Sequence, residues 1–333
     1  MGKHNETERY FSKKSTIVAG SASDENTCIR RFDDTGVYFR NFTCDSGRGG
    51  EPVEILQITD MHFNLCDAED LRDPELALTH KCRKWNAEGV SAISAEKAMD
   101  LSKYFDKTII TGDTMDYLSH GAAEMLREYI WDVDPDALVT LGGHELTKEM
   151  ETGEPDRTPL SERLAYLEKI WRHDMHYHSE VIGGKVLAVA LDNSQSKYLD
   201  RQIPLLREDI DRARKDGLVI LIFEHEPLST GFPEDASVKA IKRYDPESVN
   251  YYSGSLIGSA ERNDDPATRE IYDMITHSAD VIRGIFCGHE HSAFFTKIRA
   301  FTPDGKETFI PQPVLEGNVY DGQAGHVMRI TVH

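Results

Sequence analysis

Histidines and acidic residues gather in five short motifs, each of which comes directly after an apolar run. These are the side chains that ligate transition metals or transfer protons. Gly-His-x-His is the most specific motif, because two imidazoles that lie two residues apart in extended chain point the same way and can reach adjacent metal ions. One isolated Asp-x-His would be a chance match in a chain with 14 histidines. The motifs are Asp60-Met61-His62, Gly112-Asp113, Gly142-Gly143-His144-Glu145, Glu224-His225 and Gly288-His289-Glu290-His291.

The elements that must position these motifs can be read from the apolar pattern. Short, continuous apolar runs predict strands that are buried on both faces. Amphipathic segments lie between the runs, and this alternation predicts a layered α/β domain. Polar residues that follow parallel strands meet at one edge of such a sheet, so the motifs are expected to converge. The predicted strands are 54–59, 107–111, 137–141, 185–191, 218–223 and 281–287.

Five segments between these runs place apolar residues on one helical face. The fourth ends at Gly217, a residue suited to a left-handed helix stop. The faces are Ala98, Leu101 and Phe105; Met125, Tyr129 and Ile130; Leu164, Leu167 and Trp171; Leu206, Ile210 and Ala213; and Ile271, Met274 and Ile275.

The remaining stretches divide into sheet and loop. After His291, the runs 294–301, 308–315 and 327–332 predict antiparallel sheet that completes the same domain. The polar stretches 63–90 and 226–265 predict long loops, which are either functional lids or disordered. Residues 1–50 carry little pattern and are expected to be an N-terminal extension or an edge strand, with one domain over 51–333.

In this order the motifs resemble the signature of calcineurin-like metallophosphoesterases, which reads D-x-H, G-D, G-N-H-D/E, a lone H and G-H-x-H. The resemblance spans residues 54–298, most of the chain. It implies a four-layer α/β/β/α sandwich with mixed sheets and a two-metal site at the strand ends. Mixed histidine and aspartate ligation suits manganese, iron or zinc rather than magnesium or calcium. Two such cations, about 3.5–4 Å apart, polarise phosphoryl oxygens and activate water for attack on phosphorus.

The resemblance also implies a role for each motif residue. His144 is similar to the family's catalytic histidine, which contacts phosphate oxygens or protonates the leaving group, and Glu145 would orient it. Six residues are similar to metal ligands: Asp60, His62 and His291 for the first metal, His225 and His289 for the second, and Asp113 as the carboxylate that bridges both.

One position departs from the family pattern. The asparagine that normally gives an amide oxygen to the second metal is Gly143 here, and glycine has no side chain to coordinate. The substitution is a natural variant with a weaker second site, an engineered change, or the mark of a member that has lost turnover. We favour the first explanation, because every other motif residue, including His144, is present.

Several further residues have two readings. Asp116 and His120 follow Asp113 and reach the substrate or a metal-ligand hydrogen bond, or else cap a helix. Asp192, after the 185–191 run, either supports the site or forms a turn. Two groups have weaker signals: His173, His176 and His178, read as a polar helix end rather than a metal cluster, and Tyr251 and Tyr252, as a cover over the substrate.

Composition narrows the class of protein. The 333 residues include 38 Lys+Arg and 58 Asp+Glu, a net charge of −20, which argues against binding nucleic acid through its phosphates. No window is apolar enough to cross a membrane, and residues 1–15 are too polar for a signal peptide, so a cytoplasmic location is expected. Five cysteines without a C-x-x-C pair indicate neither a disulfide framework nor a zinc site, although Cys28 and Cys44 could pair in an exported protein.

The sequence therefore predicts a metal-dependent phosphoesterase that hydrolyses a small phosphomonoester or phosphodiester, of small-molecule or nucleotide type. Two alternatives stay open. The same fold could serve as a binding or scaffold module with little turnover, which Gly143 suggests. A mononuclear metal hydrolase could instead act on a different bond. Neither the physiological substrate nor the oligomeric state can be read from these residues.

Overall fold

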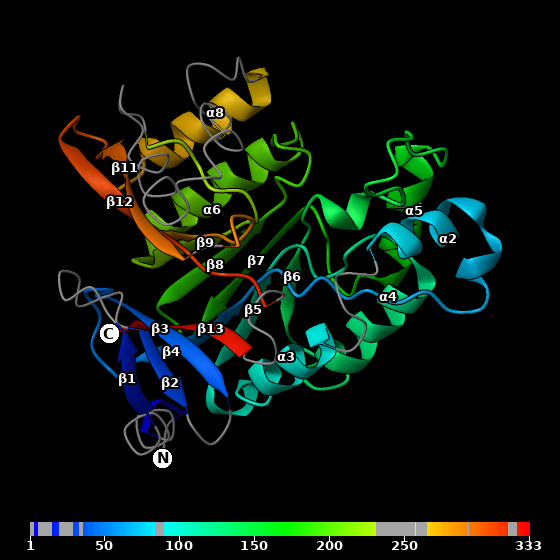
Figure 1. Ribbon diagram of the computed structural model, residues 1–333. Helices are drawn as coiled ribbons and strands as arrows, with labels where there is room; N and C mark the ends of the chain where they lie inside the picture. The colour runs from blue at the N-terminus through cyan, green and yellow to red at the C-terminus, as the bar shows by residue number, and fades with distance from the viewer. Residues whose placement is uncertain are drawn as a thin grey trace.

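The computed structural model describes residues 3–5, 15–19, 29–32, 36–83, 90–230, 257, 265–291, 293–318 and 325–333. Its strands form a seven-stranded sheet, ordered β1-β2-β3-β13-β4-β5-β6, a four-stranded sheet, ordered β10-β9-β8-β7, and the pair β11-β12 (Figure 1). The strands are β1 (Ser15–Ala19), β2 (Ile29–Phe32), β3 (Val37–Cys44), β4 (Val53–Ile58), β5 (Lys107–Thr111), β6 (Leu138–Thr140), β7 (Tyr177–Ile182), β8 (Val186–Leu191), β9 (Val219–Phe223), β10 (Ile282–Phe286), β11 (Phe294–Phe301), β12 (Glu307–Val314) and β13 (Gly325–Val332).

The helices lie between the strands, as the apolar pattern predicts, and the predicted stop at Gly217 has a φ of 67° at the end of α6. The α-helices are α2 (Pro74–Cys82), α3 (Val90–Met99), α4 (His120–Leu126), α5 (Leu160–Ile170), α6 (Gln202–Asp216) and α8 (Pro266–Thr276). Shorter helical turns are η2 (Asp70–Arg72), η4 (Ser102–Tyr104), η5 (Arg127–Trp131, a π-helix) and η6 (His144–Leu146).

Strand alternation distributes the apolar side chains between separate parts of the core. In β9, Ile220 and Ile222 belong to the cluster that includes α6 and α8, whereas Val219, Leu221 and Phe223 belong to a cluster shared by both sheets. This is the period of two that a strand imposes. It explains why β9 is apolar at every position, since both of its faces are covered.

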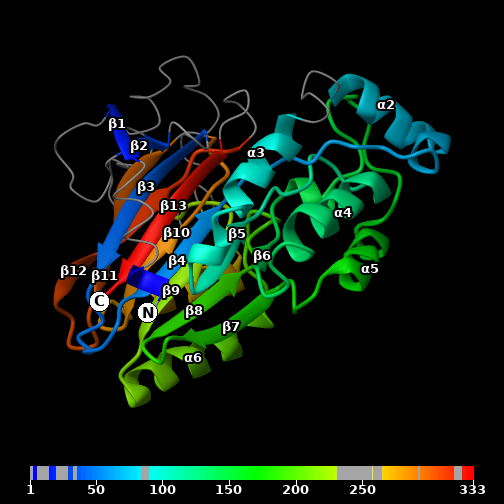
Figure 2. The ribbon, with the colours of Figure 1, turned by 90° about the horizontal axis from the view of Figure 1, so that it is seen from below.

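Three buried clusters follow the order helix, sheet, sheet, helix. One joins α3, α4 and α5 to the seven-stranded sheet, one lies between the two sheets, and one joins α6 and α8 to the four-stranded sheet. Figures 1 and 2 show the helices on these opposite sides. The predicted α/β fold with mixed sheets is confirmed, and the clusters are arranged as a four-layer sandwich would have them.

Parallel pairing brings the motifs to one edge. β4, β5 and β6 are parallel, and so are β8, β9 and β10. Backbone hydrogen bonds join the loops that follow these strands: the Asp60 N–H donates to the Gly112 carbonyl at 3.1 Å, and the Gly288 N–H donates to the His225 carbonyl at 3.1 Å. The loops that carry the motifs are thus tied together in pairs.

The C-terminal strands differ in part from the prediction. β11 and β12 are antiparallel, as expected. β13, however, lies inside the seven-stranded sheet, antiparallel to β4 but parallel to β3. Residues 37–44 are therefore an interior strand, with β2 and β1 outside it. The domain boundary near residue 50 stays a prediction.

Two regular elements were not predicted. Helix α2, with η2 before it, lies in the stretch 63–90 that was expected to be loop, and β7 pairs antiparallel with β8 at the end of its sheet. Asp73 caps α2 by accepting from the Glu75 N–H, and Pro74 begins the helix, so a start signal was present. Tyr251 and Tyr252 lie outside the described residues.

The described cysteines, Cys44, Cys66, Cys82 and Cys287, are free thiols, and Cys28 lies outside the described residues. Within the described ranges, every helix is too short or too polar to span a bilayer.

Candidate metal centre

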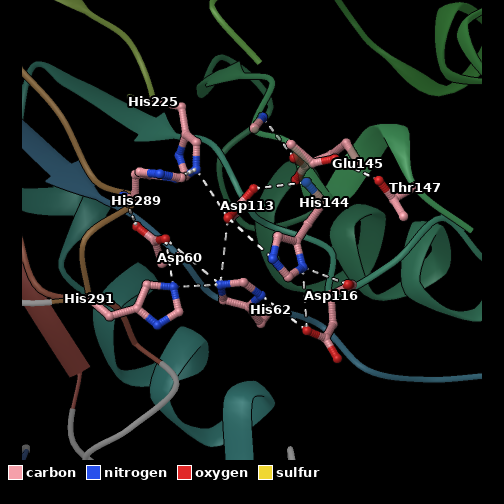
Figure 3. A network of polar contacts seen from close by, with 12 residues as sticks. Asp60, His62, Asp113, Asp116, His144, Glu145, Thr147, His225, His289 and His291 are labelled. Atoms are coloured by element: carbon pink, nitrogen blue, oxygen red, sulfur yellow. Dashed lines mark hydrogen bonds and ion pairs between the residues drawn. The ribbon is translucent and has the colours of Figure 1, made fainter. Parts of the chain in front are cut away.

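The six predicted ligands come together at the carboxyl ends of β4, β5, β9 and β10 (Figure 3). They form two groups whose ligand atoms lie within 4.8 Å of one another, and Asp113 belongs to both. The first group is Asp60, His62, Asp113 and His291, and the second is Asp113, His225 and His289. Sharing one carboxylate is the arrangement that a bridging ligand requires.

In the first group, two imidazole nitrogens and a carboxylate oxygen face a common point. His62 Nε2 lies 3.0 Å from His291 Nε2, which lies 3.1 Å from Asp60 Oδ1. In the second group, His225 Nε2 lies 3.2 Å from His289 Nδ1. Asp113 Oδ2 lies 3.0 Å from His225 Nε2 and 3.8 Å from His62 Nε2, so it faces both groups.

These distances fit a pair of cations. Histidine nitrogens and carboxylate oxygens bind zinc-like ions at about 2.0–2.2 Å, so neighbouring ligands of one ion lie roughly 3.0–3.5 Å apart. The buried Asp60 Oδ1 lies inside the first group, with the histidine nitrogens as its neighbours. A bound cation would compensate the charge of this oxygen, and the nitrogen and oxygen donor set is the one that manganese, iron and zinc accept.

The ligands occupy a backbone conformation that few residues adopt. Left-handed φ values cost about 1–3 kcal/mol in a residue with a side chain, and such strain clusters at functional sites. Five of the seven described non-glycine residues with positive φ are predicted ligands: Asp60 (48°), His62 (47°), Asp113 (48°), His289 (71°) and His291 (48°). The sharp turns after the strands thus aim the ligand side chains into one centre.

Glycines in the motifs leave room for the ligands. A Cβ at Gly142 would lie 2.1 Å from Asp113 Oδ1, and a Cβ at Gly112, whose φ is 80°, would lie 2.6 Å from His225 Nδ1. Either contact is shorter than van der Waals separation allows. The glycines are therefore needed for the close packing of backbone against the ligands.

Hydrogen bonds fix which nitrogen of His225 and of His62 faces the centre. His225 Nδ1 lies 2.8 Å from the Thr111 carbonyl, to which it donates, so Nε2 is left for a metal. His62 Nδ1 lies 3.1 Å from Asp116 Oδ1, which likewise leaves its Nε2 for the first group. A carboxylate or carbonyl behind a metal-binding histidine is the usual means of setting its orientation.

His144 lies beside the two groups. Its ring makes an edge contact with that of His62 at 4.4 Å, and its Nε2 lies 3.8 Å from Asp113 Oδ2. Nδ1 donates to the Asp116 carbonyl oxygen at 2.7 Å. The His144 side chain is 23% exposed, whereas that of His62 is 1% exposed, so His144 lies on the open side of the centre.

Glu145 does not orient His144, which corrects the expectation drawn from the motif. Its buried carboxylate accepts from the backbone N–H groups of Thr114, Met115 and Gly142. The residue thus ties the loop after β5 to the loop after β6. Asp116 takes the orienting role, through its carbonyl and through Oδ1, which lies 3.6 Å from His144 Nδ1. Of the two roles considered for Asp116, a hydrogen bond to a metal ligand or a helix cap, the structure therefore shows the first.

Burial and neighbouring charges shift the pKa values of the centre. Burial disfavours the charged form of His62, but the carboxylates around it, Asp116 foremost, raise its pKa to about 10, so a cation that binds Nε2 would replace a proton there. Burial, reinforced by the charge of His225, lowers the pKa of His289 to about 3. Asp113 is also buried, yet His225 and the other histidines hold the pKa of its carboxyl well below its usual range. The carboxylate predicted to bridge the two cations is therefore ionised.

The other candidates lie apart from the ligands. His120 begins α4, and its Nδ1 lies 2.6 Å from Asp67 Oδ2. Asp192 contacts His176 Nδ1 at 2.5 Å and accepts from Ser194. The three residues His173, His176 and His178 do not form a helix end, because His173 lies in the loop after α5 and His178 lies in β7. None of the three belongs to a metal group within the described residues.

Two asparagines that support the centre were missed. Asn193 Oδ1 accepts from the His225 N–H at 3.2 Å. The buried Asn318 donates from Nδ2 to the Thr59 carbonyl at 3.1 Å, and its N–H donates to the Asp60 carbonyl at 2.9 Å. Asn193 was visible as the neighbour of Asp192 in a turn after a predicted strand, whereas nothing in the sequence singled out Asn318.

Gly143 lies on the open side, beside His144. Its φ of −68° and ψ of −31° are helical values that any residue can adopt. The nearest atom to a Cβ built there is the Ser194 carbonyl oxygen, at 3.6 Å, an ordinary contact. Unlike Gly142, this glycine is not required by the backbone or by its surroundings.

No protein-family model matches the sequence, and no curated protein matches it. Solved structures that it resembles include a dimetal phosphatase from Danio rerio, with 12% identity and a TM-score of 0.43, over 80% of this chain and 88% of that one. A putative 5'-nucleotidase from Staphylococcus aureus has 11% identity and a TM-score of 0.42, over 81% and 49%. Purple acid phosphatase PPD1 from yellow lupin has 10% identity and a TM-score of 0.46, over 91% and 58%.

This chain thus spans about half of the second structure's length and 58% of the third's. The matched structures belong to the calcineurin-like metallophosphoesterase superfamily, which the motifs resemble. These matches concern the fold alone. The chemistry of this chain depends on its own residues.

Proposed function

We propose that this protein is a metal-dependent phosphoesterase that hydrolyses a small phosphomonoester or phosphodiester. The observation that carries the proposal is the pair of ligand groups that share Asp113, with His144 beside them on the open side. Asp60, His62 and His291 would hold one cation, and His225 and His289 the other. Two cations at this centre would polarise phosphoryl oxygens and activate water for attack on phosphorus.

The residues of the chain set where the substrate lies and where a proton moves. His144 Nδ1 donates to the Asp116 carbonyl, so Nε2 is the nitrogen that contacts a phosphate oxygen or, in the protonated ring, protonates the leaving oxygen. His289 and His291 are partly exposed, as is His144, whereas the other ligands are buried. The phosphate would therefore approach from the side on which these three histidines lie.

The charge of the chain bears on the class of substrate. With a net charge of −20, the surface repels extended polyanions, so nucleic acid is not an expected substrate. Cations at the centre would reverse this field locally for a small phosphate ester. A nucleotide or another small ester is the substrate type that we propose, in a protein that acts away from membranes.

A binding or scaffold role is the second candidate, and Gly143 is the observation that favours it. Without an amide ligand, the second group has two histidines and the shared carboxylate. A cation held by fewer ligands dissociates more readily, and a protein with one occupied site could bind phosphate without turnover. The mononuclear hydrolase differs from both, because it predicts full activity with one metal per chain.

The experiment that separates these candidates is hydrolysis of p-nitrophenyl phosphate and bis-p-nitrophenyl phosphate by metal-stripped protein to which Mn²⁺ is returned. We expect release of nitrophenol that requires the metal, and the faster ester identifies a monoesterase or a diesterase. No release of nitrophenol from either ester at full metal occupancy would reject the proposal in favour of the binding module.

A further inference from the structure

Helix α2 presents one face to the loop that follows β5. Leu76, His80 and Arg83 are spaced i, i+4 and i+7, so they lie on the same side of the helix. Leu76 shares a buried cluster with Tyr117, and His80 Nδ1 lies 2.7 Å from the Tyr117 hydroxyl. Arg83, at the end of the helix, reaches the preceding residue, Asp116. The helix thus contacts two consecutive residues of this loop.

Arg83 holds the Asp116 carboxylate by both oxygens. Nε donates to Oδ2 at 3.0 Å, and Nη2 donates to Oδ1. Asn64 Nδ2 completes the arrangement, because it donates to Asp116 Oδ2 at 2.7 Å and to the Arg83 carbonyl at 3.1 Å. Asp116 is fully buried and Arg83 is 6% exposed. A two-pronged guanidinium contact of this kind fixes the plane of a carboxylate as well as its charge.

The fixed carboxylate in turn contacts two residues of the centre. Asp116 Oδ1 lies 3.1 Å from His62 Nδ1 and 3.6 Å from His144 Nδ1. Rotation of the carboxylate would therefore disturb a ligand of the first group and the residue proposed to contact phosphate. Arg83 also donates from Nη1 to Glu151 Oε1 at 2.9 Å. Its bond to the Asp116 carboxylate is the contact that links it to the two histidines.

We propose that Arg83 is a positioning residue that holds Asp116 so that His62 faces the first metal and His144 faces the bridging carboxylate. Arg83 lies outside all five motifs, in a helical excursion between β4 and α3. This helical segment therefore contributes to the site. The expected effect on hydrolysis rests on the proposed function, whereas the expected effect on metal binding does not.

The test compares Arg83→Lys with Arg329→Lys. Arg329 is a close match: it is 8% exposed, and it donates from Nε and Nη2 to both oxygens of the fully buried Glu54, each at 2.9 Å. Glu54 lies near the start of β4, at the opposite end from Asp60. Lysine keeps the charge in both variants but cannot make the two-pronged contact.

We expect Arg83→Lys to bind Mn²⁺ about tenfold more weakly by calorimetry and to lose about 10–100-fold in kcat with little change in KM, the size of effect seen for supports of metal ligands. Both variants should lower the unfolding temperature by a similar amount, because each loses a two-pronged contact. Arg329→Lys should leave Mn²⁺ affinity and kcat unchanged. Guanidinium ion at millimolar concentration should restore Mn²⁺ affinity to Arg83→Ala, and ammonium ion should not.

Parental Mn²⁺ affinity and kcat in a folded Arg83→Lys would overturn the proposal, as would an equal loss of both in Arg329→Lys. If Arg83→Lys does not fold, Asn64→Ala removes another donor to the same carboxylate, and unchanged Mn²⁺ affinity there would also overturn it. A parent protein that binds Mn²⁺ but hydrolyses neither ester would contradict the proposed function alone, because calorimetry would still decide the role of Arg83.

Discussion

At the scale of single residues, a variant of His144 can test catalysis separately from metal binding. It belongs to neither of the two groups that share Asp113, but its Nε2 lies 3.8 Å from the Asp113 carboxylate. We predict that His144→Ala lowers kcat by about 10²–10⁴-fold, the range for loss of a proton-transfer residue, and keeps the metal content of the parent. Kinetics and metal analysis of the same sample check this. Parental kcat in the variant would remove His144 from the mechanism.

Gly143 allows the second site to be strengthened. Its helical φ and ψ and the 3.6 Å distance to the nearest atom permit a larger side chain. We predict that Gly143→Asn, which adds an amide oxygen, binds the second Mn²⁺ about tenfold more tightly, or about 1.4 kcal/mol. Gly143→Ala is the control, since it adds the Cβ without the oxygen. Equal affinities in Gly143→Asn and Gly143→Ala would show that the missing amide is not what limits the second site.

His173 predicts how stability responds to acid, away from the metal ligands. Burial, reinforced by the charges of His178 and Lys107 and opposed by Asp174, lowers the pKa of His173 from 6.5 to about 4. Its Nε2 accepts from the Val139 N–H at 3.0 Å, which requires the neutral ring. The unfolded chain therefore takes up a proton near pH 6.5, and the folded chain only near pH 4.

The stability contributed by neutral His173 is thus complete above pH 6.5 and is lost as the pH falls towards 4. The loss is on the order of 3 kcal/mol in the free energy of unfolding. We predict that His173→Gln, which cannot titrate, loses less stability than the parent over this interval, in urea titrations with a chelator present. Parallel pH profiles for the two proteins would contradict this assignment.

The sequence predicts those residues of the site that lie in a motif. All six predicted ligands meet in the structure, because each follows a strand whose end the sheet fixes. The partner of His144 could not be predicted. Glu145 is its neighbour in sequence, yet the backbone carbonyl of Asp116, which lies 28 residues before His144, accepts the hydrogen bond from His144 Nδ1. Arg83 and Asn318 are likewise brought to the site only by packing.

At the scale of elements, the glycine that follows β5 shows which residue the turn after a strand requires. Gly112 combines a φ of 80° with a site where a Cβ would lie 2.6 Å from the His225 ring. We predict that Gly112→Ala weakens the second metal and destabilises the fold by more than the roughly 1–3 kcal/mol cost of the φ value alone. Chemical unfolding and Mn²⁺ calorimetry provide the measurement.

Gly305 supplies the matched control for this prediction. Its φ of 81° is nearly the same, but no atom lies within 4 Å of a Cβ built there. Gly305→Ala should therefore show the cost of the φ value without any change in Mn²⁺ affinity. Equal losses of stability and affinity in Gly112→Ala and Gly305→Ala would exclude the proposed contact with His225.

The elements that the sequence predicts well are those with a strong local pattern. All six central strands are found, because a run buried on both faces is mostly apolar. β7 was missed, since its middle residues are only partly buried and the apolar pattern is weak. The place of β13 beside β3 could not be predicted, because pairing between the two ends of a chain leaves no local signal.

At the scale of the whole molecule, the centre should link metal binding to stability. It draws four histidines and two aspartates from loops that follow strands of both sheets. A cation that binds only the folded chain stabilises it by about 2.7 kcal/mol when its concentration is 100 times Kd. We predict that Mn²⁺ raises the urea midpoint of unfolding, and that His225→Ala reduces this gain. A midpoint that does not respond to Mn²⁺ would contradict the assembly of the ligands in the folded state.

The most direct test of the two-metal centre is a titration of metal-stripped protein with Mn²⁺ in which bound metal per chain and ester hydrolysis are measured together. If the groups that share Asp113 act as proposed, hydrolysis stays low until the first site fills and rises as the second site fills, up to two ions per chain. Full activity with one ion per chain, or no hydrolysis with two, would contradict the two-metal phosphoesterase.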